Sequence, residues 1–113
     1  MEEREFLVLA DAELARLEAA LEKLQEVSEA DWDFELKPGG IIEIGFADDS
    51  KIIINRHAAA REIWVAARSG GFHFKLPANS GGRWLDSRSG RDLAEVLGLC
   101  LSEQGGVALL LDW

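Results

Sequence analysis

Carboxylates are the residues of this chain that are best arranged to do chemistry. In a helix over residues 3–27, at 100° per residue, four of them fall within an arc of about 80°. These four residues are Asp11, Glu18, Glu22 and Glu26. Carboxylate oxygens are the ligands that hard cations prefer, and a row of them also attracts a basic protein surface. The row therefore predicts a surface that binds a cation or a basic partner.

A second acidic row follows in residues 31–36, where acidic and apolar residues alternate. This alternation is typical of a half-buried strand, and it places Asp31, Asp33 and Glu35 on one face at a spacing of about 7 Å. If the strand follows the helix closely at the edge of a sheet, the two rows meet in one ridge. The name acidic ridge is used below for Asp11, Glu18, Glu22, Glu26, Asp31 and Asp33.

The net charge of the chain comes from the same region. Residues 1–35 hold twelve acids and three bases, whereas residues 36–113 hold nine of each, so the first third accounts for the formal charge of −9. Two like-charged i,i+4 pairs in the helix, Glu18–Glu22 and Glu22–Glu26, each cost about 0.2–0.5 kcal/mol, which a cation or basic partner would relieve. The charge argues against nucleic acids and anionic membranes as partners. A solvated helix face that serves solubility alone is the alternative.

The other reactive residue types form no catalytic or metal-binding motif. His57 and His73 are the only histidines, and each is expected to be a surface or hydrogen-bonded residue. Cys100 falls on the apolar stripe of a helix, which favours a buried structural thiol over a nucleophile. The glycine pairs at 70–71 and 81–82 indicate turns, because neither precedes a helix with the Lys-Ser/Thr of a phosphate-binding loop. We therefore expect no enzymatic activity.

Asn55 and Trp64 are candidates for contact with a protein partner. Ile63 and Val65 would share the core face of a strand, so Trp64 would point outward from the sheet, and Asn55 is expected to do the same on the strand before it. An exposed tryptophan beside an asparagine on an uncovered sheet face is typical of a binding surface. The alternative is a ring packed flat over its sheet neighbours.

The elements that position these residues are predicted from periodicity. Apolar spacings of three and four predict a helix over residues 3–27 and a second one from residue 93 to the glycines at 105–106, with Ser89 beginning its capping box. Strands are predicted over residues 31–36, 41–46, 51–56, 62–68, 72–76 and 83–86. Short turns indicate an antiparallel sheet, and the two terminal helices should cover one face of it. The expected fold is an α+β two-layer sandwich.

Length and composition predict one domain over residues 1–113. The apolar tail, residues 107–113, is expected to fold back over the helices, because five large apolar side chains are costly to leave in water. The single cysteine and the acidic N-terminus, which lacks a secretory signal, lead us to expect a cytoplasmic location.

Four segments together resemble the frataxin family in its bacterial, CyaY-type form. They are residues 50–56 (SKIIINR), 63–64 (IW), 70–74 (GGFHF) and 84–86 (WLD), and the resemblance spans roughly residues 5–100. Their order and spacing are specific only when taken together. The resemblance implies the same fold of two helices on an antiparallel sheet.

The resemblance also implies a bacterial, cytoplasmic, iron-binding regulator of iron–sulfur cluster assembly. Such a protein would bind Fe²⁺ or Fe³⁺ weakly at surface carboxylates and would dock on the cysteine desulfurase and the cluster scaffold protein. A monomer is expected, with metal-dependent oligomers as the alternative. The family's ridge positions correspond to Asp11, Glu18, Glu22, Asp31 and Asp33, and its sheet positions to Asn55 and Trp64.

The chain departs from the family pattern at several positions. Ala19 and Lys23 stand where many relatives have acids, Glu62 replaces a glutamine, and Glu26 and Glu29 are ridge candidates by geometry alone. The missing acids at Ala19 and Lys23 weaken the prediction of metal binding more than the prediction of docking. A cation needs adjacent carboxylates, whereas a basic surface needs only the negative electrostatic field of the ridge. Two alternatives stay open: an acidic interaction module with incidental metal binding, and an iron-storage or ferroxidase protein.

Overall fold

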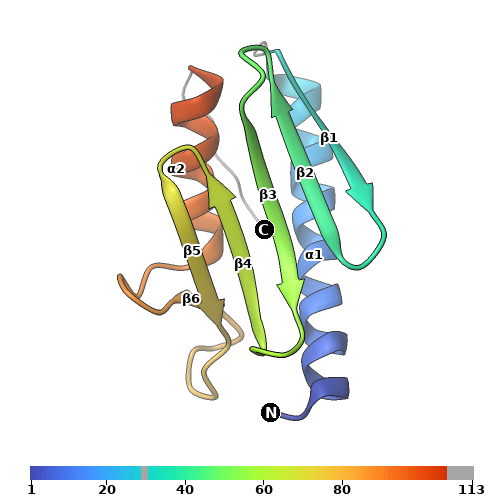
Figure 1. Cartoon of the computed structure of the whole chain (residues 1–113), viewed down its shortest axis with the longest axis vertical. Coiled ribbons are helices and arrows are strands. Elements are labelled where there is room, and N and C mark those ends of the chain that lie inside the picture. The colour runs from blue at the N-terminus through green and yellow to red at the C-terminus, as the bar shows by residue number, and fades with distance from the viewer. Residues whose placement is uncertain (29–30, 107–113) are drawn as a thin grey trace.

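The chain folds as a helix, six strands and a second helix, as a computed structural model that describes residues 1–28 and 31–106 shows (Figure 1). The helices are α1 (Glu3–Val27) and α2 (Leu93–Gly105). The strands are β1 (Trp32–Lys37), β2 (Ile41–Phe46), β3 (Lys51–His57), β4 (Glu62–Ala67), β5 (Gly70–Lys75) and β6 (Leu85–Asp86). This architecture confirms the predicted α+β fold class.

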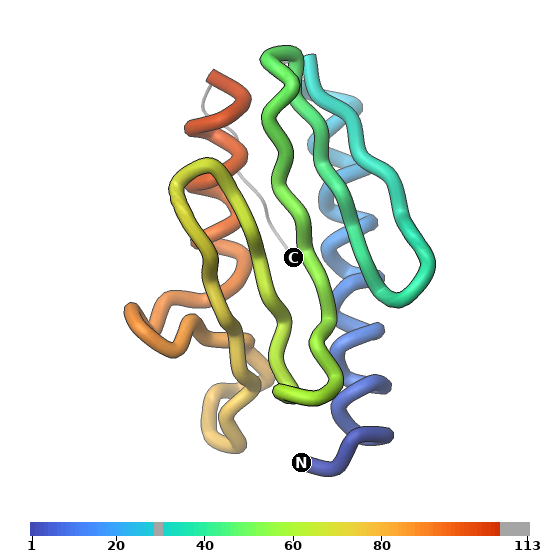
Figure 2. Tube along the Cα trace, viewed as in Figure 1, coloured from blue at the N-terminus to red at the C-terminus, as the bar shows by residue number. Residues whose placement is uncertain are grey.

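The strands form one antiparallel sheet in the order β1-β2-β3-β4-β5-β6. Both helices lie behind the same face of this sheet, with α1 behind the β1–β3 half and α2 behind the β4–β5 half (Figure 1, Figure 2). No described element covers the opposite face, which we call the outer face. The strand periodicity therefore divides the side chains into a helix-facing set and an outward-facing set.

The core fills the space between the helices and the sheet. The apolar stripe of α1 meets the inward-facing residues of the central strands, and the indole of Trp84 meets the ring of Phe6 edge to face, with the ring centroids 6.0 Å apart. The largest fully buried side chains are Trp84, Phe6, Phe74, Leu17, Leu21, Ile42, Ile44, Ile52, Ile54, Ile63, Leu93 and Leu97. Burial of such side chains, at roughly 25 cal/mol per Å² of apolar surface, is the main force that holds the two layers together.

Strand β1 buries its apolar face at one end only. Trp32 is buried next to the last turn of α1, whereas Leu36, on the same face of the strand, is 52% exposed. The reason is positional, because the far end of β1 lies away from α1 in Figure 1. β1 is thus an edge strand that the helix supports only where the strand begins.

Local turn chemistry differs from the sequence expectation in two places. The β4–β5 hairpin turns on Arg68 and Ser69 alone, because Ala67 already pairs with Gly70, so β5 begins two residues earlier than predicted. The prediction that Ser89 begins the cap of α2 was wrong. Asp92 is the N-cap, and its carboxylate accepts the Glu95 backbone N–H at 2.8 Å.

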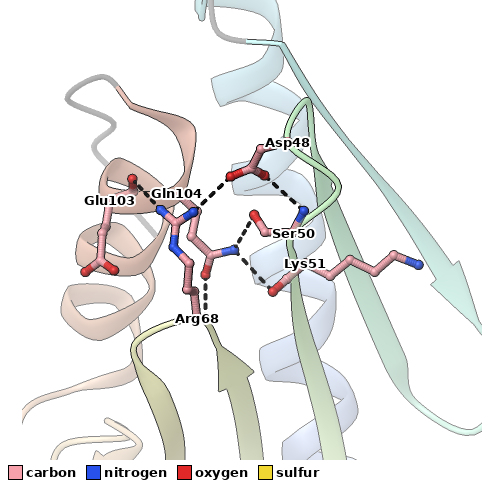
Figure 3. A network of polar contacts seen from close by, with 6 residues as sticks. All are labelled: Asp48, Ser50, Lys51, Arg68, Glu103 and Gln104. Atoms are coloured by element: carbon pink, nitrogen blue, oxygen red, sulfur yellow. Dashed lines mark hydrogen bonds and ion pairs between the residues drawn. The ribbon is translucent and has the colours of Figure 1, made fainter.

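A buried amide joins the C-terminal end of α2 to two hairpin turns (Figure 3). The residue is Gln104, which is 7% exposed. Its Oε1 accepts the Arg68 backbone N–H at 2.9 Å, and its Nε2 donates to Ser50 Oγ at 3.0 Å and to the Lys51 carbonyl at 3.2 Å. One side chain therefore satisfies three polar groups from the two turns.

The Arg68 guanidinium reinforces the same junction from its exposed side. It donates to the Asp48 carboxylate at 2.9 Å and to the Glu103 carbonyl at 3.2 Å (Figure 3). The second bond gives a partner to one of the carbonyls that a helix C-terminus leaves open. A cation at this end of α2 also matches the negative end of the helix dipole.

The described residues decide one question about membranes and leave two predictions from the sequence untested. Among the described residues, no helix is long and apolar enough to cross a bilayer. The tail at residues 107–113, with its predicted packing on the helices, lies outside the described residues, and so does Glu29.

We expect Gln104→Leu to lower the free energy of unfolding by about 2–3 kcal/mol, because it leaves buried N–H and carbonyl groups without partners. Urea denaturation with an unchanged m-value would measure the loss. Glu103→Ala is the matched control: its side chain is exposed and only its carbonyl bonds Arg68, so a change within about 0.5 kcal/mol is expected. Equal losses in both variants would contradict the role of the amide.

Candidate functional site

The acidic ridge runs from α1 onto β1, and a bridging amide holds the two elements together. Gln25 in the last turns of α1 donates its Nε2–H to the Trp32 carbonyl at 3.3 Å and to Asp33 Oδ1 at 3.4 Å. The Trp32 indole N–H in turn donates to Ser28 Oγ at 3.3 Å. Both conditions for the two acidic rows to meet are present, since β1 starts against the helix and is the edge strand.

Four carboxylates of the acidic ridge have no ion pair or hydrogen bond within the described part of the chain. They are Glu18, Glu22, Glu26 and Asp31. Three of them are exposed, and Glu18 is half-buried on α1. Their charge is therefore available to a cation or a basic surface from outside the protein.

Asp11 stands apart from these four because the protein already supplies its counter-charge. Arg56 Nη1 lies 2.5 Å from Asp11 Oδ1, and Arg56 Nε donates to the Gly39 carbonyl at 3.3 Å. The neighbouring Gly40 has φ +74°, and a Cβ at that position would collide with the Arg56 side chain. A cation at Asp11 would therefore compete with Arg56, whose side chain is held in place by the turn between β1 and β2.

Asp33 belongs to the wall of a shallow hollow of about 320 Å³ at the β1–β2 edge. Its Oδ1 also accepts the Phe34 backbone N–H at 2.9 Å. Asp31, Glu35, Glu43 and Lys51 are among the other residues that line the hollow. The mixed charges make it a polar depression next to the ridge rather than a purely anionic one.

The ridge is open, with no closed coordination site. Within residues 1–28 and 31–106, no three His, Cys, Asp or Glu side chains converge closely enough to hold a metal ion. Hard cations bind such surfaces through one or two carboxylates, and water completes the coordination shell. The arrangement can therefore attract cations weakly and can meet a basic surface over its whole length.

On the outer face, Asn55 and Trp64 form a cross-strand pair between β3 and β4. Both are half-buried, and the buried neighbours Ile63 and Val65 show that Trp64 points away from the helices, as predicted. The indole lies between two imidazoles, with centroid distances of 3.8 Å to His57 and 4.4 Å to His73 and interplanar angles of 14° and 12°. The alternative of a ring packed against its sheet neighbours is thus also partly right.

The Glu62 carboxylate contacts both Trp64 and His73 of this group, and it also lies near Lys75. Its Oε1 accepts the Trp64 indole N–H at 2.7 Å and lies 3.7 Å from His73 Nδ1, while Oε2 lies 3.6 Å from Lys75 Nζ. Sequence reasoning missed the stacking of the two histidines on Trp64. The cross-strand register carries the signal, because His57 is opposite Glu62 and His73 is opposite Trp64 once the hairpins are aligned.

Glu43 forms ion pairs with two lysines on the β1–β3 half of the outer face. Lys37 Nζ lies 2.6 Å from Oε2, and Lys51 Nζ lies 2.6 Å from Oε1. Hydrogen bonds from Lys37 and then Lys51 lower the pKa of Glu43 from 4.5 to about 2. This carboxylate therefore stays charged and internally paired, unlike those of the acidic ridge.

The remaining candidate, Cys100, is buried in α2 as predicted. Burial raises the pKa of the Cys100 thiol, and Ser69 Oγ lies 3.7 Å from its sulfur. A thiol in this environment is a poor nucleophile.

Comparisons with known proteins cover nearly the whole chain. A family model described as a frataxin-like domain matches residues 1–107. The iron-sulfur cluster assembly protein CyaY of Dechloromonas aromatica (strain RCB) is 52% identical over 111 residues, which is 98% of this chain and 99% of that protein.

Solved structures show the same similarity. The frataxin of Psychromonas ingrahamii matches with a TM-score of 0.83 and 26% identity over 100% of both chains. Trimeric frataxin from the yeast Saccharomyces cerevisiae, solved in complex with ferrous iron, matches with a TM-score of 0.73 and 27% identity over 87% of this chain and 86% of that one.

The low pKa of Glu43 predicts how stability depends on acid. Because the folded-state pKa is about 2 and the ordinary value is 4.5, the stabilisation by Glu43 is complete above pH 4.5 and is lost as pH falls toward 2. We expect Glu43→Gln to flatten the loss of stability over this range, as measured by urea unfolding at a series of pH values. Glu26→Gln, which removes an unpaired carboxylate, should keep the wild-type slope, and a wild-type slope in Glu43→Gln would contradict the prediction.

Proposed function

The chain belongs to the frataxin-like family, and we propose on this basis that it acts in iron–sulfur cluster assembly. The four-segment resemblance of the sequence is confirmed by the family match over residues 1–107. A relative that carries the name of an assembly protein aligns with 98% of the chain, so the similarity covers every element of the fold. The proposed role is that of a regulator or adaptor that works by binding rather than by catalysis.

The acidic ridge is the surface through which we propose that the chain docks on a cysteine desulfurase complex. The observation that carries this proposal is the lack of internal counter-charge at Glu18, Glu22, Glu26 and Asp31 within the described residues. A row of unpaired carboxylates steers and orients a basic surface over its whole length. The missing acids at Ala19 and Lys23 interrupt the row but leave the negative electrostatic field of the acidic ridge in place.

Weak iron binding at the same carboxylates is the second part of the proposal. Carboxylate oxygens are suitable ligands for Fe²⁺ and Fe³⁺, and the open ridge leaves positions for water. The yeast frataxin that matches this fold was solved with ferrous iron, which supports iron binding by this chain. Among the six ridge residues, Asp11 should contribute least, because Arg56 already pairs with it.

Asn55 and Trp64 are proposed to contact a second component of the machinery, such as the cluster scaffold protein. They lie on the outer face, two and three strands away from β1, so one molecule could meet two partners at once. Tryptophan, with tyrosine and arginine, is enriched among the residues that contribute most of the binding energy at protein interfaces.

A docking module with incidental metal binding is the second candidate function. Two observations favour it: the described residues bring no three metal ligands together, and the ridge includes an acid already paired with an arginine. An iron-storage or ferroxidase activity would require geometrically closed ligand sets, which an open ridge does not provide.

Titration of the ¹⁵N-labelled chain with Fe²⁺ under anaerobic conditions tests the iron proposal. We expect the amide resonances of Glu18, Glu22 and Asp31 to shift or broaden first, because their carboxylates are unpaired. The amide of Asp11 should respond later than these. Changes confined to the hairpin turns of the sheet would contradict the iron proposal and would leave docking as the function of the ridge.

Charge reversal tests docking. We expect Glu18→Lys with Glu22→Lys to weaken binding to purified cysteine desulfurase by about tenfold or more, because two attractive contacts with a basic surface become repulsive. The matched control, Glu95→Lys with Glu103→Lys, makes the same charge change on exposed positions of α2 and should bind like the wild type. Calorimetry at low salt would measure both affinities, and equal affinities of the two variants would argue against docking through the ridge.

A further inference from the structure

Strand β6 has only two residues, so it covers only the last part of β5. Their contact extends from the Lys75–Leu85 pair to the Ser87 backbone N–H, which donates to the His73 carbonyl at 3.0 Å. Residues 70–72, which we call the open segment of β5, therefore have no strand on this side among the described residues. Both glycines of the open segment are exposed.

The backbone of the open segment presents one donor and one acceptor to solvent. Successive residues of a strand direct their N–H and carbonyl groups to opposite sides. Because the His73 carbonyl points toward β6, the N–H and carbonyl of Gly71 point to the same side, away from β4, and have no partner within the described residues. The open segment also carries no charged side chain, although charge commonly protects the edges of sheets. An extended chain alongside Gly71 would satisfy both backbone groups.

A hollow of about 260 Å³ lies next to the open segment, between β5 and the helix α2 behind it (Figure 1). Its walls include Ser69, Phe72, Val96, Leu99, Cys100 and Glu103. Phe72 is on the helix-facing side of the sheet, because it packs partly against the core on the same side as the buried Phe74. Leu99 is 54% exposed, so solvent reaches the apolar wall that α2 contributes. A strand added to β5 would cover this apolar surface.

The pleat of an added strand determines which of its side chains would enter the hollow. The residue opposite Gly71 would point to the outer face, and its two neighbours, opposite Gly70 and Phe72, would point to the helix side. The position opposite Phe72 suits an apolar side chain. The position opposite Gly70 is next to the β4–β5 turn, where the exposed Glu103 carboxylate has no ion pair among the described residues. This position therefore suits a basic side chain.

We infer that the open segment of β5 and the hollow beside it form a strand-addition site, which takes an extended segment of a protein partner. This segment carries an apolar and a basic side chain two positions apart, the first for the hollow and the second for Glu103. The inference goes beyond the proposed function, because the site lies at the β5 edge of the sheet whereas the acidic ridge lies on α1 and β1.

Other occupants fit this site less well. Two copies of the chain could pair here only through residues 70–72, because the β4–β5 turn and β6 limit the open segment, and so short a contact falls well below the roughly 1,200 Å² of a stable interface. A small apolar molecule would leave the Gly71 N–H and carbonyl without protein partners. An acidic segment would be repelled by Glu103.

Two capped peptides of the same composition test the inference by NMR on the ¹⁵N-labelled full chain. The matched peptide, Thr-Leu-Thr-Lys-Thr, has its leucine and lysine on one face of a strand, and the control, Thr-Leu-Lys-Thr-Thr, has them on opposite faces. At saturation, we expect the matched peptide to shift the Gly71 amide and to slow its hydrogen exchange by about fivefold or more. Attraction of lysine to the acidic ridge is common to both peptides. Equal responses at Gly71, or shifts by the matched peptide in α1 and β1 alone, would overturn the inference.

Variants of exposed side chains test the two pockets of the site without disturbing the core. Leu99→Gln should weaken binding of the matched peptide by about fivefold, because it removes exposed apolar surface from the hollow. Val8→Gln makes a similar change at an exposed position of α1 and should leave this binding unchanged. Glu103→Gln should weaken it by about threefold, and should have no effect on a peptide with norleucine in place of lysine. Equal effects of Leu99→Gln and Val8→Gln would overturn the inference.

A single capped residue separates strand addition from a pocket for small apolar molecules. N-acetyl-leucine methylamide has the leucine side chain without the strand, and we expect it to bind at least about tenfold more weakly than the matched peptide, since main-chain hydrogen bonds supply much of the affinity in strand addition. Equal affinities would show that the hollow alone is the site and would overturn the inference.

A ridge variant makes failure of the two proposals distinguishable. Glu18→Gln with Glu22→Gln should preserve the difference between the matched and control peptides at Gly71. If the ridge fails to bind cysteine desulfurase while the matched peptide still selects β5, the strand-addition site is supported and only the docking role of the ridge is lost. If this variant abolishes the difference between the peptides, the β5 site is not independent and the inference is overturned.

Discussion

Packing of the apolar stripe of α1 against the isoleucines of β2 and β3 is the contact on which the rest of the molecule depends. Once Ile42, Ile44, Ile52 and Ile54 face the helix, the residues between them must face the other way. The same contact orients α1, so that Gln25 in its last turns reaches Trp32 and Asp33 of β1. The acidic ridge and the group around Trp64 on the outer face therefore both follow from how one core is packed.

The two surfaces differ in how their charges are satisfied. On the outer face, Glu43 lies between two lysines and Glu62 lies among Trp64, His73 and Lys75, so each of these acids is used within the fold. Most carboxylates of the acidic ridge have no such partner within the described residues. This contrast distinguishes acids that hold the sheet together from acids that are left for an external partner, and charge counts alone do not reveal it.

Sequence periodicity predicted the elements well and the cross-chain contacts poorly. The bounds of α1 follow directly from its apolar spacing, and the outward direction of Trp64 follows from its two apolar neighbours. By contrast, the Asp11–Arg56 ion pair joins residues 45 positions apart, and no local sequence pattern predicts it. The histidine stack depends on the register of two hairpins, and the cap at Asp92 depends on Ser89 turning instead toward Asp86, at 2.7 Å. Such contacts follow only from the assembled fold.

The position of β1 at the sheet edge has a consequence for self-association. An edge strand leaves backbone N–H and carbonyl groups unpaired, and a second copy could extend the sheet there. Asp31, Asp33 and Glu35, close to this edge, make two like edges repel each other, which is a common protection against edge-to-edge aggregation. Loss of these negative charges would therefore weaken that protection at this one strand.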